Sequence, residues 1–221
     1  LTPANYSLSG LLSGESFSIT QVLGTYNSKD VLSANSITAS LSTSDFLPVG
    51  DTLASNYSLP ASLTGAGSIS TKSVAASIIN SPTKPYDGSD NSTLAPNNYF
   101  LSGLITGESF SVTKTTATYN SPNVVTASGV STTLIASDFT PGPDTSAANY
   151  SLPASAAGNA IITAKALTAS ITGNPNKIYD WTTASTLAPE NFSLSGLVSG
   201  QSFSVTQVLG TYNSKDVLSA N

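Results

Sequence analysis

The chain has 221 residues, a formal net charge of −5 at pH 7, and neither Cys nor His. Without Cys it can form no disulfide bond, thiolate metal site or cysteine nucleophile, and without His it lacks the commonest general base and metal ligand near neutral pH. The acidic balance, with no basic cluster, argues against nucleic acid and anionic membrane surfaces as partners. No continuous apolar run has the length of a membrane-spanning helix, so we expect no insertion into a membrane.

Small hydroxyl-bearing residues dominate the composition. Ser and Thr make up 68 of the 221 residues, whereas only 9% are charged, a low value for a cytosolic protein. Apolar residues account for 39% and are scattered in alternating patterns. This content is sufficient for a folded β structure and is unlike that of a disordered chain.

One run of sequence occurs three times at a constant spacing. Its copies begin at Asn5, Asn98 and Asn191, so both steps are 93 residues long. A fixed period indicates that each repeat is one structural unit and that the chain is an array. A unit of this length can hold a modest core of its own.

Apolar and small polar residues alternate along most of the chain, which is the pattern of half-buried β-strands. Ser16–Thr20 places Phe17 and Ile19 on one face and hydroxyl groups on the other. The same alternation predicts further strands, for example at Ile37–Leu41, Ile69–Ser70 and Val74–Ile78.

Turn signals interrupt this alternation about every 8–12 residues, a spacing typical of β-sandwiches and related folds. They lie at Ser13-Gly14, Pro48–Asp51, Asp87-Gly88, Pro141–Pro143 and Gly173–Pro175. No long stretch has helical periodicity. At most one short helical turn per unit is expected, near Leu41–Phe46 and Leu134–Phe139, where Ser precedes an Asp-Phe pair.

These patterns predict an all-β protein, a tandem array of elongated β-sandwich-like or β-grasp-like modules with a 93-residue period. We place the module boundaries near Lys72 and Lys165. Residues 1–71 then form a module without its N-terminal part, residues 72–164 a complete module, and residues 165–221 a partial one. Both ends fall inside repeats, as in a window of a longer array. No Gly-, Ser- or Pro-rich spacer separates the modules, which favours semi-rigid junctions.

The word Lys-x-Tyr-Asp ends at Asp87 and again at Asp180. Asp followed by Gly88 has the chemistry of a tight turn, because Asp accepts local backbone N–H bonds and Gly adopts positive φ. Trp181 follows the second Asp, which indicates that positive φ is not required there. Calcium is the alternative for the oxygen-rich loop Asp87–Ser92, but this loop lacks the EF-hand pattern.

Four lysines recur at fixed places, Lys72 and Lys165 at the module boundaries and Lys84 and Lys177 before the Tyr-Asp word. We expect solvated or snorkelling side chains. The alternative is a covalent crosslink between a buried Lys and an Asn.

The carboxylates of the repeated run are Glu15 and Glu108, but Gln201 takes their place in the third copy. An acid–base role would be lost there, whereas a structural hydrogen bond survives the change. The pair Lys29 and Asp30 is likewise not retained, because Pro and Asn stand at the equivalent positions of the next copy.

The recurring aromatic residues lie within alternating strands, and we interpret them as core and cross-strand pairs. They are Tyr6, Phe17, Tyr26, Phe46, Tyr57 and their counterparts. A solvent-facing platform for sugars is the alternative. The Asn-x-Ser/Thr motifs are weak glycosylation signals. They begin at Asn5, Asn56, Asn91, Asn149 and Asn191. We therefore predict no catalytic, cofactor-binding or metal-binding residues.

Several sequence motifs resemble the YDG-type repeat of large bacterial surface adhesins. They are Lys177–Ala184, Leu194–Gly200, Asn56–Leu59, Gly65–Lys72 and Gly158–Leu167. The chain departs from the pattern at Pro85, Trp181, Phe100 and Phe192. Such repeats occur in filamentous-haemagglutinin-like proteins of Gram-negative bacteria, often exported by two-partner secretion. The resemblance implies β-rich stalk modules outside the cell and supplies no catalytic residues.

We therefore expect a structural stalk or fibre segment of a secreted adhesin or biofilm matrix protein at the bacterial cell surface, and no enzyme. Its partners would be neighbouring repeats, and in addition other copies of itself or surface glycans. Two alternatives stay open. The first is a repeat-borne module that binds glycans or proteins, and the second is a self-associating fibre subunit that pairs through its edge strands.

Overall fold

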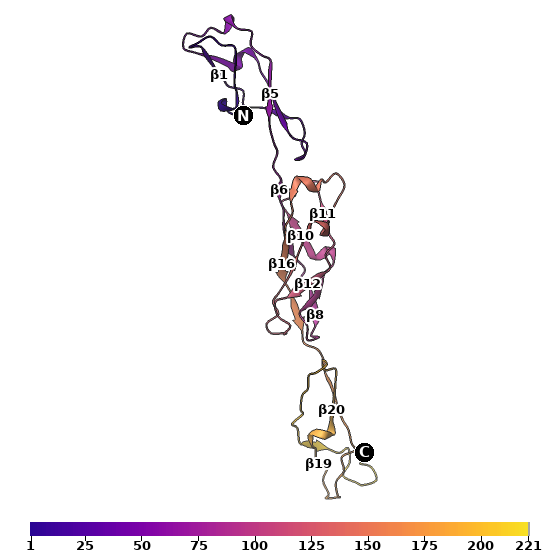
Figure 1. The fold of residues 1–221 in the computed structure, drawn as a ribbon. Coiled ribbons are helices and arrows are strands. Elements are labelled where there is room, and N and C mark those ends of the chain that lie inside the picture. Colours follow the sequence, from indigo (N-terminus) through magenta and orange to yellow (C-terminus); the bar gives the residue numbers. More distant parts are fainter. Residues whose placement is uncertain (221) are drawn as a thin grey trace. The chain divides into compact units, whose positions relative to one another are not determined.

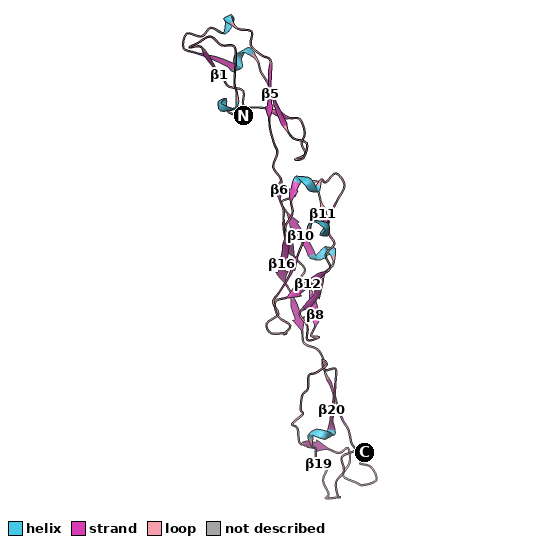
Figure 2. Ribbon diagram, viewed as in Figure 1, coloured by secondary structure: helices cyan, strands magenta, loops and turns pink. Residues whose placement is uncertain are grey.

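A computed structural model describes residues 1–220 (Figure 1). Within these residues the regular structure is short β-strands and single turns of 3-10 helix, with no α-helix (Figure 2). The prediction of an all-β protein is therefore confirmed. None of the helical segments in this part of the chain has the length and apolar character needed to cross a bilayer.

The contacts divide the chain into two compact units. The first comprises residues 1–77, 99–114 and 133–156, and the remaining residues belong to the second. The predicted module boundaries at Lys72 and Lys165, the sandwich-like or grasp-like architecture and the array with a 93-residue period stay predictions.

The first unit is built from small sheets. Antiparallel partners are β1 (Ser16–Ile19) with β4 (Phe46–Val49), β3 (Ser36–Ser40) with both β2 (Thr25–Tyr26) and β5 (Ser62–Ala66), and β11 (Phe110–Val112) with β14 (Phe139–Pro141). Strand β7 (Ala75–Ile78) pairs with β10 (Tyr99–Ser102). One pair is parallel, β6 (Lys72–Ser73) with β15 (Tyr150–Ser151).

The second unit contains most of a four-stranded sheet. Its order is β16 (Ser155–Asn159), β13 (Gly129–Thr133), β12 (Thr116–Tyr119) and β9 (Asn91–Thr93). Strand β8 (Thr83–Pro85) pairs in parallel with β17 (Ile161–Thr163). Two antiparallel pairs follow, β18 (Thr168–Ile171) with β20 (Phe192–Ser195) and β19 (Ala184–Thr186) with β21 (Leu209–Thr211).

Both predicted helical turns are present as 3-10 turns, η2 (Thr43–Asp45) and η5 (Ala136–Asp138). In η2 the Asp45 carboxylate accepts hydrogen bonds of 2.7 Å from the backbone N–H and the hydroxyl of Ser42. These bonds hold the pKa of Asp45 below its usual range. The turn thereby fixes the direction of the chain before Phe46, which is buried.

The sequence did not predict the other five 3-10 turns. They are η1 (Pro3–Asn5), η3 (Ala54–Asn56), η4 (Pro96–Asn98), η6 (Ala147–Asn149) and η7 (Pro189–Asn191). All five end in Asn. In η1, η4 and η7 its side-chain oxygen accepts a bond from the backbone N–H three residues earlier. Two of the Asn-x-Ser/Thr motifs, at Asn5 and Asn191, thus begin with an Asn that closes its own turn.

The core of the first unit forms around the aromatic residues of the repeated run. Phe46, Ile19 and Leu41 are buried together, and Phe17 packs on Phe46 edge to face with ring centroids 6.2 Å apart. The pair Phe110 and Phe139 has the same geometry at 6.3 Å. The interpretation as core and cross-strand pairs is confirmed for these four aromatic residues, whereas Phe203, the counterpart of Phe110, is 68% exposed.

Tyr26 lies opposite Ile37 across β2 and β3, as a cross-strand pair, but it is not part of the core. It is 40% exposed, whereas Tyr119, its counterpart in the next copy, is 3% exposed. The Tyr119 hydroxyl donates to the carbonyl of Pro82, which lies 37 residues earlier.

The predicted strand at Ile69–Ser70 is also wrong, because these residues lie in an irregular segment between β5 and β6. Their counterparts Ile162 and Thr163 are in β17, which pairs with β8, a strand from much earlier in the sequence. Alternation favours a strand, but a ladder forms only where a second backbone supplies the hydrogen bonds.

A glycine in β16 shows how closely two strands approach in the second unit. A Cβ atom added at Gly158 would overlap the carbonyl oxygen of Ile78, whereas a Cβ at Gly65, its counterpart in the preceding copy, would meet nothing within 4 Å. Gly158→Ala should therefore lower the free energy of unfolding by about 1–3 kcal/mol, the usual cost of overpacking.

Urea denaturation of Gly158→Ala and Gly65→Ala measures this difference. Gly65→Ala is the matched control and should change the stability by less than about 0.5 kcal/mol. Equal effects of the two substitutions would contradict the close approach of β7 and β16.

Candidate functional site

The first Lys-x-Tyr-Asp motif and the serine after it form a closed polar cluster. We call it the Lys84 cluster (Lys84, Asp87 and Ser89). The Lys84 ammonium group donates to the Asp87 carboxylate at 2.8 Å, and to the carbonyl and hydroxyl oxygens of Ser89 at 2.9 Å each. An ammonium group has three N–H donors. All three are used within the loop, so Lys84 has no donor left for a ligand.

The Lys84 side chain, whose three donors are all used, is also largely buried. The Lys84 side chain is only 18% exposed, and its ammonium nitrogen lies 5.6 Å from the centre of the Tyr119 ring. Of the two expected states, a solvated lysine does not describe Lys84; its stem is covered, as in a snorkelling side chain, but its ammonium group binds protein oxygens. A charge can lie this deep because a carboxylate, two oxygens and an aromatic face replace its water. Lys72 and Lys165, by contrast, are exposed as expected.

Asp87 makes the predicted turn. One oxygen of its carboxylate accepts bonds from the backbone N–H of Ser89 at 2.9 Å and from the Ser89 hydroxyl at 3.0 Å, in addition to Lys84. The Lys84 ammonium group is the largest cause, and the Ser89 N–H the next, of a pKa of Asp87 lowered to about 2. The carboxylate therefore stays ionised at any pH near neutrality.

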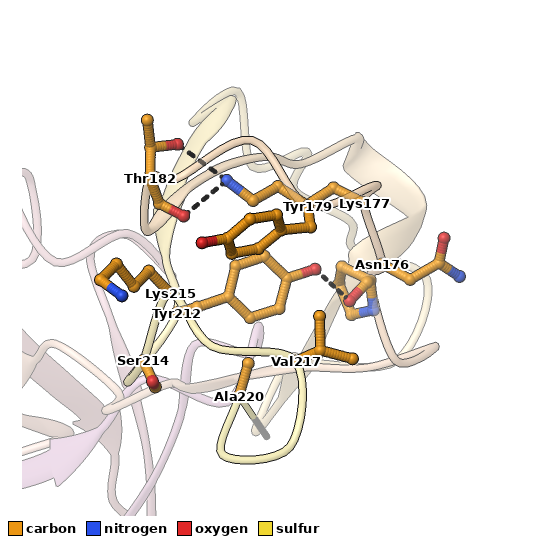
Figure 3. A pocket seen from close by; sticks show the side chains of 10 residues that line it. Asn176, Lys177, Tyr179, Thr182, Tyr212, Ser214, Lys215, Val217 and Ala220 are labelled. Carbon is orange, nitrogen blue, oxygen red and sulfur yellow. Dashed lines mark hydrogen bonds between the residues drawn. The ribbon is translucent and has the colours of Figure 1, made fainter.

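The same cluster recurs in the second copy of the motif, and Figure 3 shows its Lys177 and Thr182. Lys177 donates to Asp180 at 2.7 Å, and to the carbonyl and hydroxyl oxygens of Thr182 at 2.9 and 2.8 Å. Asp180 has its pKa lowered to about 2, again with Lys177 as the largest cause. Thr thus replaces Ser without changing the pattern of hydrogen bonds.

The backbone after Asp180 corrects one inference from the sequence. Trp181 predicts that positive φ is not required there, yet its φ is 69°, close to the 83° of Gly88. The turn therefore imposes the left-handed conformation even on a bulky side chain, at some cost in strain. The hydrogen bonds of Lys177 and Thr182 to Asp180 hold it in place.

A hollow of about 230 Å³ lies beside Tyr212 and is lined by Pro175, Lys177, Tyr179 and Val217 among others (Figure 3). Tyr212 donates to the carbonyl of Pro175 at 2.5 Å, the counterpart of the bond from Tyr119 to Pro82. Tyr119 is buried, whereas Tyr212 is partly exposed. We therefore interpret the hollow as an uncovered part of a core rather than as a ligand pocket.

The carboxylates of the repeated run bind tyrosine hydroxyl groups. Tyr57 donates to Glu15 and Tyr150 donates to Glu108. Burial, and then the bond to Glu108, raise the pKa of Tyr150. Gln201 also meets a tyrosine, donating from its amide to the Tyr86 hydroxyl at 2.5 Å. The expectation that a structural hydrogen bond survives the change to Gln is thus met, although with a different tyrosine.

The sequence did not reveal the contact of Asn149 with Asp30 and Val31, which lie more than 100 positions earlier in the chain. Asn149 accepts a bond from the backbone N–H of Val31 and donates to the Asp30 carboxylate, both at 2.8 Å. The Asn149 amide is the largest cause, before Lys29, of a lowered pKa of Asp30. No local pattern signals this contact, because its partners are distant in the sequence.

Two further interpretations concern metal ions and sugars. Among residues 1–220, no group of three or more His, Cys, Asp or Glu side chains could hold a metal ion. The loop Asp87–Ser92 therefore offers calcium no such group of carboxylates. Tyr179 and Trp181 are exposed neighbours with ring centroids 5.7 Å apart, and Lys215 lies 4.7 Å from the centre of the Trp181 ring.

A comparison with known families identifies the central part of the chain. The profile of the family described as YDG domain matches residues 70–158, so a YDG domain is found there. The match includes the Lys84 cluster and the pair Glu108 and Tyr150. Comparisons with curated proteins and with solved structures gave no significant match.

The Lys84 cluster generates a prediction about pH. The folded pKa of Asp87 is about 2, below the unfolded value of about 3.9, so the carboxylate stabilises the fold above about pH 4 and loses this effect as the pH falls towards 2. NMR titration should show the Asp87 carboxyl group titrating near pH 2 in the native chain. In Lys84→Met its pKa should move towards the unfolded value, because the largest cause of the shift is removed.

The matched control is Lys165→Met, which removes an exposed lysine outside the cluster and should leave the titration of Asp87 unchanged. A native pKa near the unfolded value, or one that Lys84→Met does not raise, would contradict the cluster.

The pair Glu108 and Tyr150 generates a second prediction. Glu108→Gln should keep the fold with a small loss of stability, because an amide oxygen can accept the tyrosine hydrogen bond. Glu108→Leu should lower the free energy of unfolding by about 1–2 kcal/mol, since it leaves the buried hydroxyl without this acceptor. Urea denaturation measures the free energy of unfolding of both variants and so distinguishes Glu108→Gln from Glu108→Leu. If Gln were as destabilising as Leu, the hydrogen bond would not be the reason for the carboxylate.

Proposed function

We propose that this chain is a stalk or fibre segment of a secreted bacterial adhesin or biofilm matrix protein at the cell surface, acting as a non-catalytic spacer. The main support for the proposal is that the same side-chain contacts recur wherever the sequence repeats. The pairs Tyr57–Glu15 and Tyr150–Glu108, and the clusters at Lys84 and Lys177, each recur after one 93-residue step.

Such recurrence supports a tandem array of modules, in which length depends on copy number. The resemblance to adhesin repeats, together with the YDG domain at residues 70–158, supports the extracellular stalk role. The Ser- and Thr-rich composition with few charges fits a solvated spacer.

The state of the polar clusters supports a structural rather than a catalytic role. The donors of Lys84 and Lys177 are committed to neighbouring oxygens, and the lowered pKa values of Asp87 and Asp180 disfavour proton transfer near neutral pH. Glu15 and Glu108 each bind a tyrosine. Such groups fix loops in place.

Small-angle X-ray scattering of the chain tests the proposal. A compact globule of this length would have a radius of gyration of about 17 Å. Modules joined end to end by short junctions should give a clearly larger value and a rod-like profile, in calcium and in chelator alike. A radius of gyration close to that of the compact globule would contradict the spacer role, and a profile that extends only with calcium would restore a metal site.

Two rival functions are decided by other measurements on the same chain. Specific binding in a glycan array would favour a recognition module, for which the exposed Tyr179 and Trp181 are the candidate platform. Concentration-dependent sedimentation would favour a fibre subunit that associates through edge strands. The spacer role predicts neither.

A further inference from the structure

Two parallel strand pairs link early and late parts of the segment that spans residues 72–163. In the first unit, Lys72 and Ser73 of β6 lie opposite Tyr150 and Ser151 of β15. In the second unit, β8 (Thr83–Pro85) lies opposite β17 (Ile161–Thr163). All the other paired strands with an assigned register within residues 1–220 are antiparallel.

Backbone hydrogen bonds run along both parallel pairs. Val74 donates to Ser151 at 3.0 Å beside β6 and β15. Beside β8 and β17, Ile161 donates to Pro82 at 3.0 Å, and Tyr86 donates to Thr163 at 2.8 Å. The bonds therefore extend one residue beyond β8 on either side.

One face of the second pair is shielded from water, whereas the side chains of Thr83 and Ile161 are exposed. Ile162, in the middle of β17, is fully buried, and so is Ala160 just before it. Opposite Ile162 stands Lys84, whose side chain is closed off by its own cluster. Water therefore has little access to this side of the ladder, where it would compete for the backbone bonds.

The direction of the strands determines how they respond to tension. Strands β6 and β8 continue backwards to the N-terminal part of the chain, and β15 and β17 continue forwards to the C-terminal part. Because each pair is parallel, tension along the chain pulls its two strands in opposite directions along their own axes. All bonds of a pair are then loaded together. In a pair pulled apart from one end, the bonds would break one after another.

We propose that these parallel pairs act as a mechanical clamp, a further function in which the segment bears tension transmitted along the chain. In each unit the force enters through the earlier strand of the pair, β6 or β8, and leaves through the later strand, β15 or β17, so that most of the sequence between the two strands carries no load while the bonds hold. The clamp deepens the proposed spacer function and rests on it for its biological setting, since a surface stalk is pulled from both ends.

Single-molecule force spectroscopy with two pulling directions tests the clamp. The chain has no Cys, so two introduced cysteines, labelled under reducing conditions, define where the force acts. Lys72→Cys with Lys165→Cys loads the pairs in shear. Thr83→Cys with Ile161→Cys pulls directly opposite residues of β8 and β17 apart. All four side chains are exposed, so the fold should tolerate the changes.

In shear we expect abrupt rupture of the pairs, which together releases about 90 residues, an extension of roughly 300 Å. Its force should be at least twofold higher than the rupture force of the second variant at the same loading rate, while thermal melting of the two variants is the same. Equal rupture forces, or a gradual extension in shear, would overturn the clamp. Forced unfolding follows the unfolding rate rather than the equilibrium stability. The two variants can therefore differ in rupture force although their melting temperatures are equal.

A second comparison separates the clamp from general stability. Val112→Ala creates a cavity at a fully buried side chain of β11, outside both parallel pairs. It should lower the melting temperature but reduce the shear rupture force by less than a fifth. A proportional fall in both would overturn the clamp. A compact scattering profile combined with a high shear force would instead reject the spacer and keep the clamp.

Discussion

The parallel pairing of β8 with β17 is the constraint on which the second unit depends. It brings together backbone segments that are far apart in the sequence, with Thr83 opposite Ile161, and closing such a distance costs conformational entropy that local interactions do not recover. The buried side chains of Ile162 and Ala160, together with the hydrogen bonds of Ile161 and Tyr86, offset this cost. Ile69, the counterpart of Ile162, lies in an irregular segment.

The Lys84 cluster depends on a different kind of interaction, because all its hydrogen bonds join residues within five positions of one another. This explains why it recurs unchanged at Lys177, beside a Tyr212 that is only partly covered. Local polar contacts need only the local sequence, whereas burial needs a second segment. The closed loop also shields the ammonium charge, which would otherwise oppose the packing of β17 against β8.

The difference between local contacts and contacts of distant segments determines how much of the fold and of the site could be predicted from the sequence. Alternation and turn chemistry predicted the all-β class, strands β1, β3 and β7, the turns η2 and η5, and the role of Asp87, because these features depend on neighbouring residues. The burial of Lys84 against Tyr119, the contact of Asn149 with Asp30 and the parallel pairs were not predicted, because they join distant positions. Trp181 adds a separate lesson. A residue type reports a preference for φ, and a sufficiently strong set of hydrogen bonds overrides it.

Three pairs of equivalent residues lead to one physical conclusion. Tyr26 and Tyr119, Ile69 and Ile162, and Gly65 and Gly158 each occupy the same place in successive copies, and the later member is always the more closely packed. Each later residue is in contact with a segment from much earlier in the sequence: Pro82, β8 or Ile78. In each of these pairs the closely packed residue is therefore the one that contacts a distant segment of the chain. Mechanical resistance should follow the same rule, because the bonds that bear load are those that close this distance.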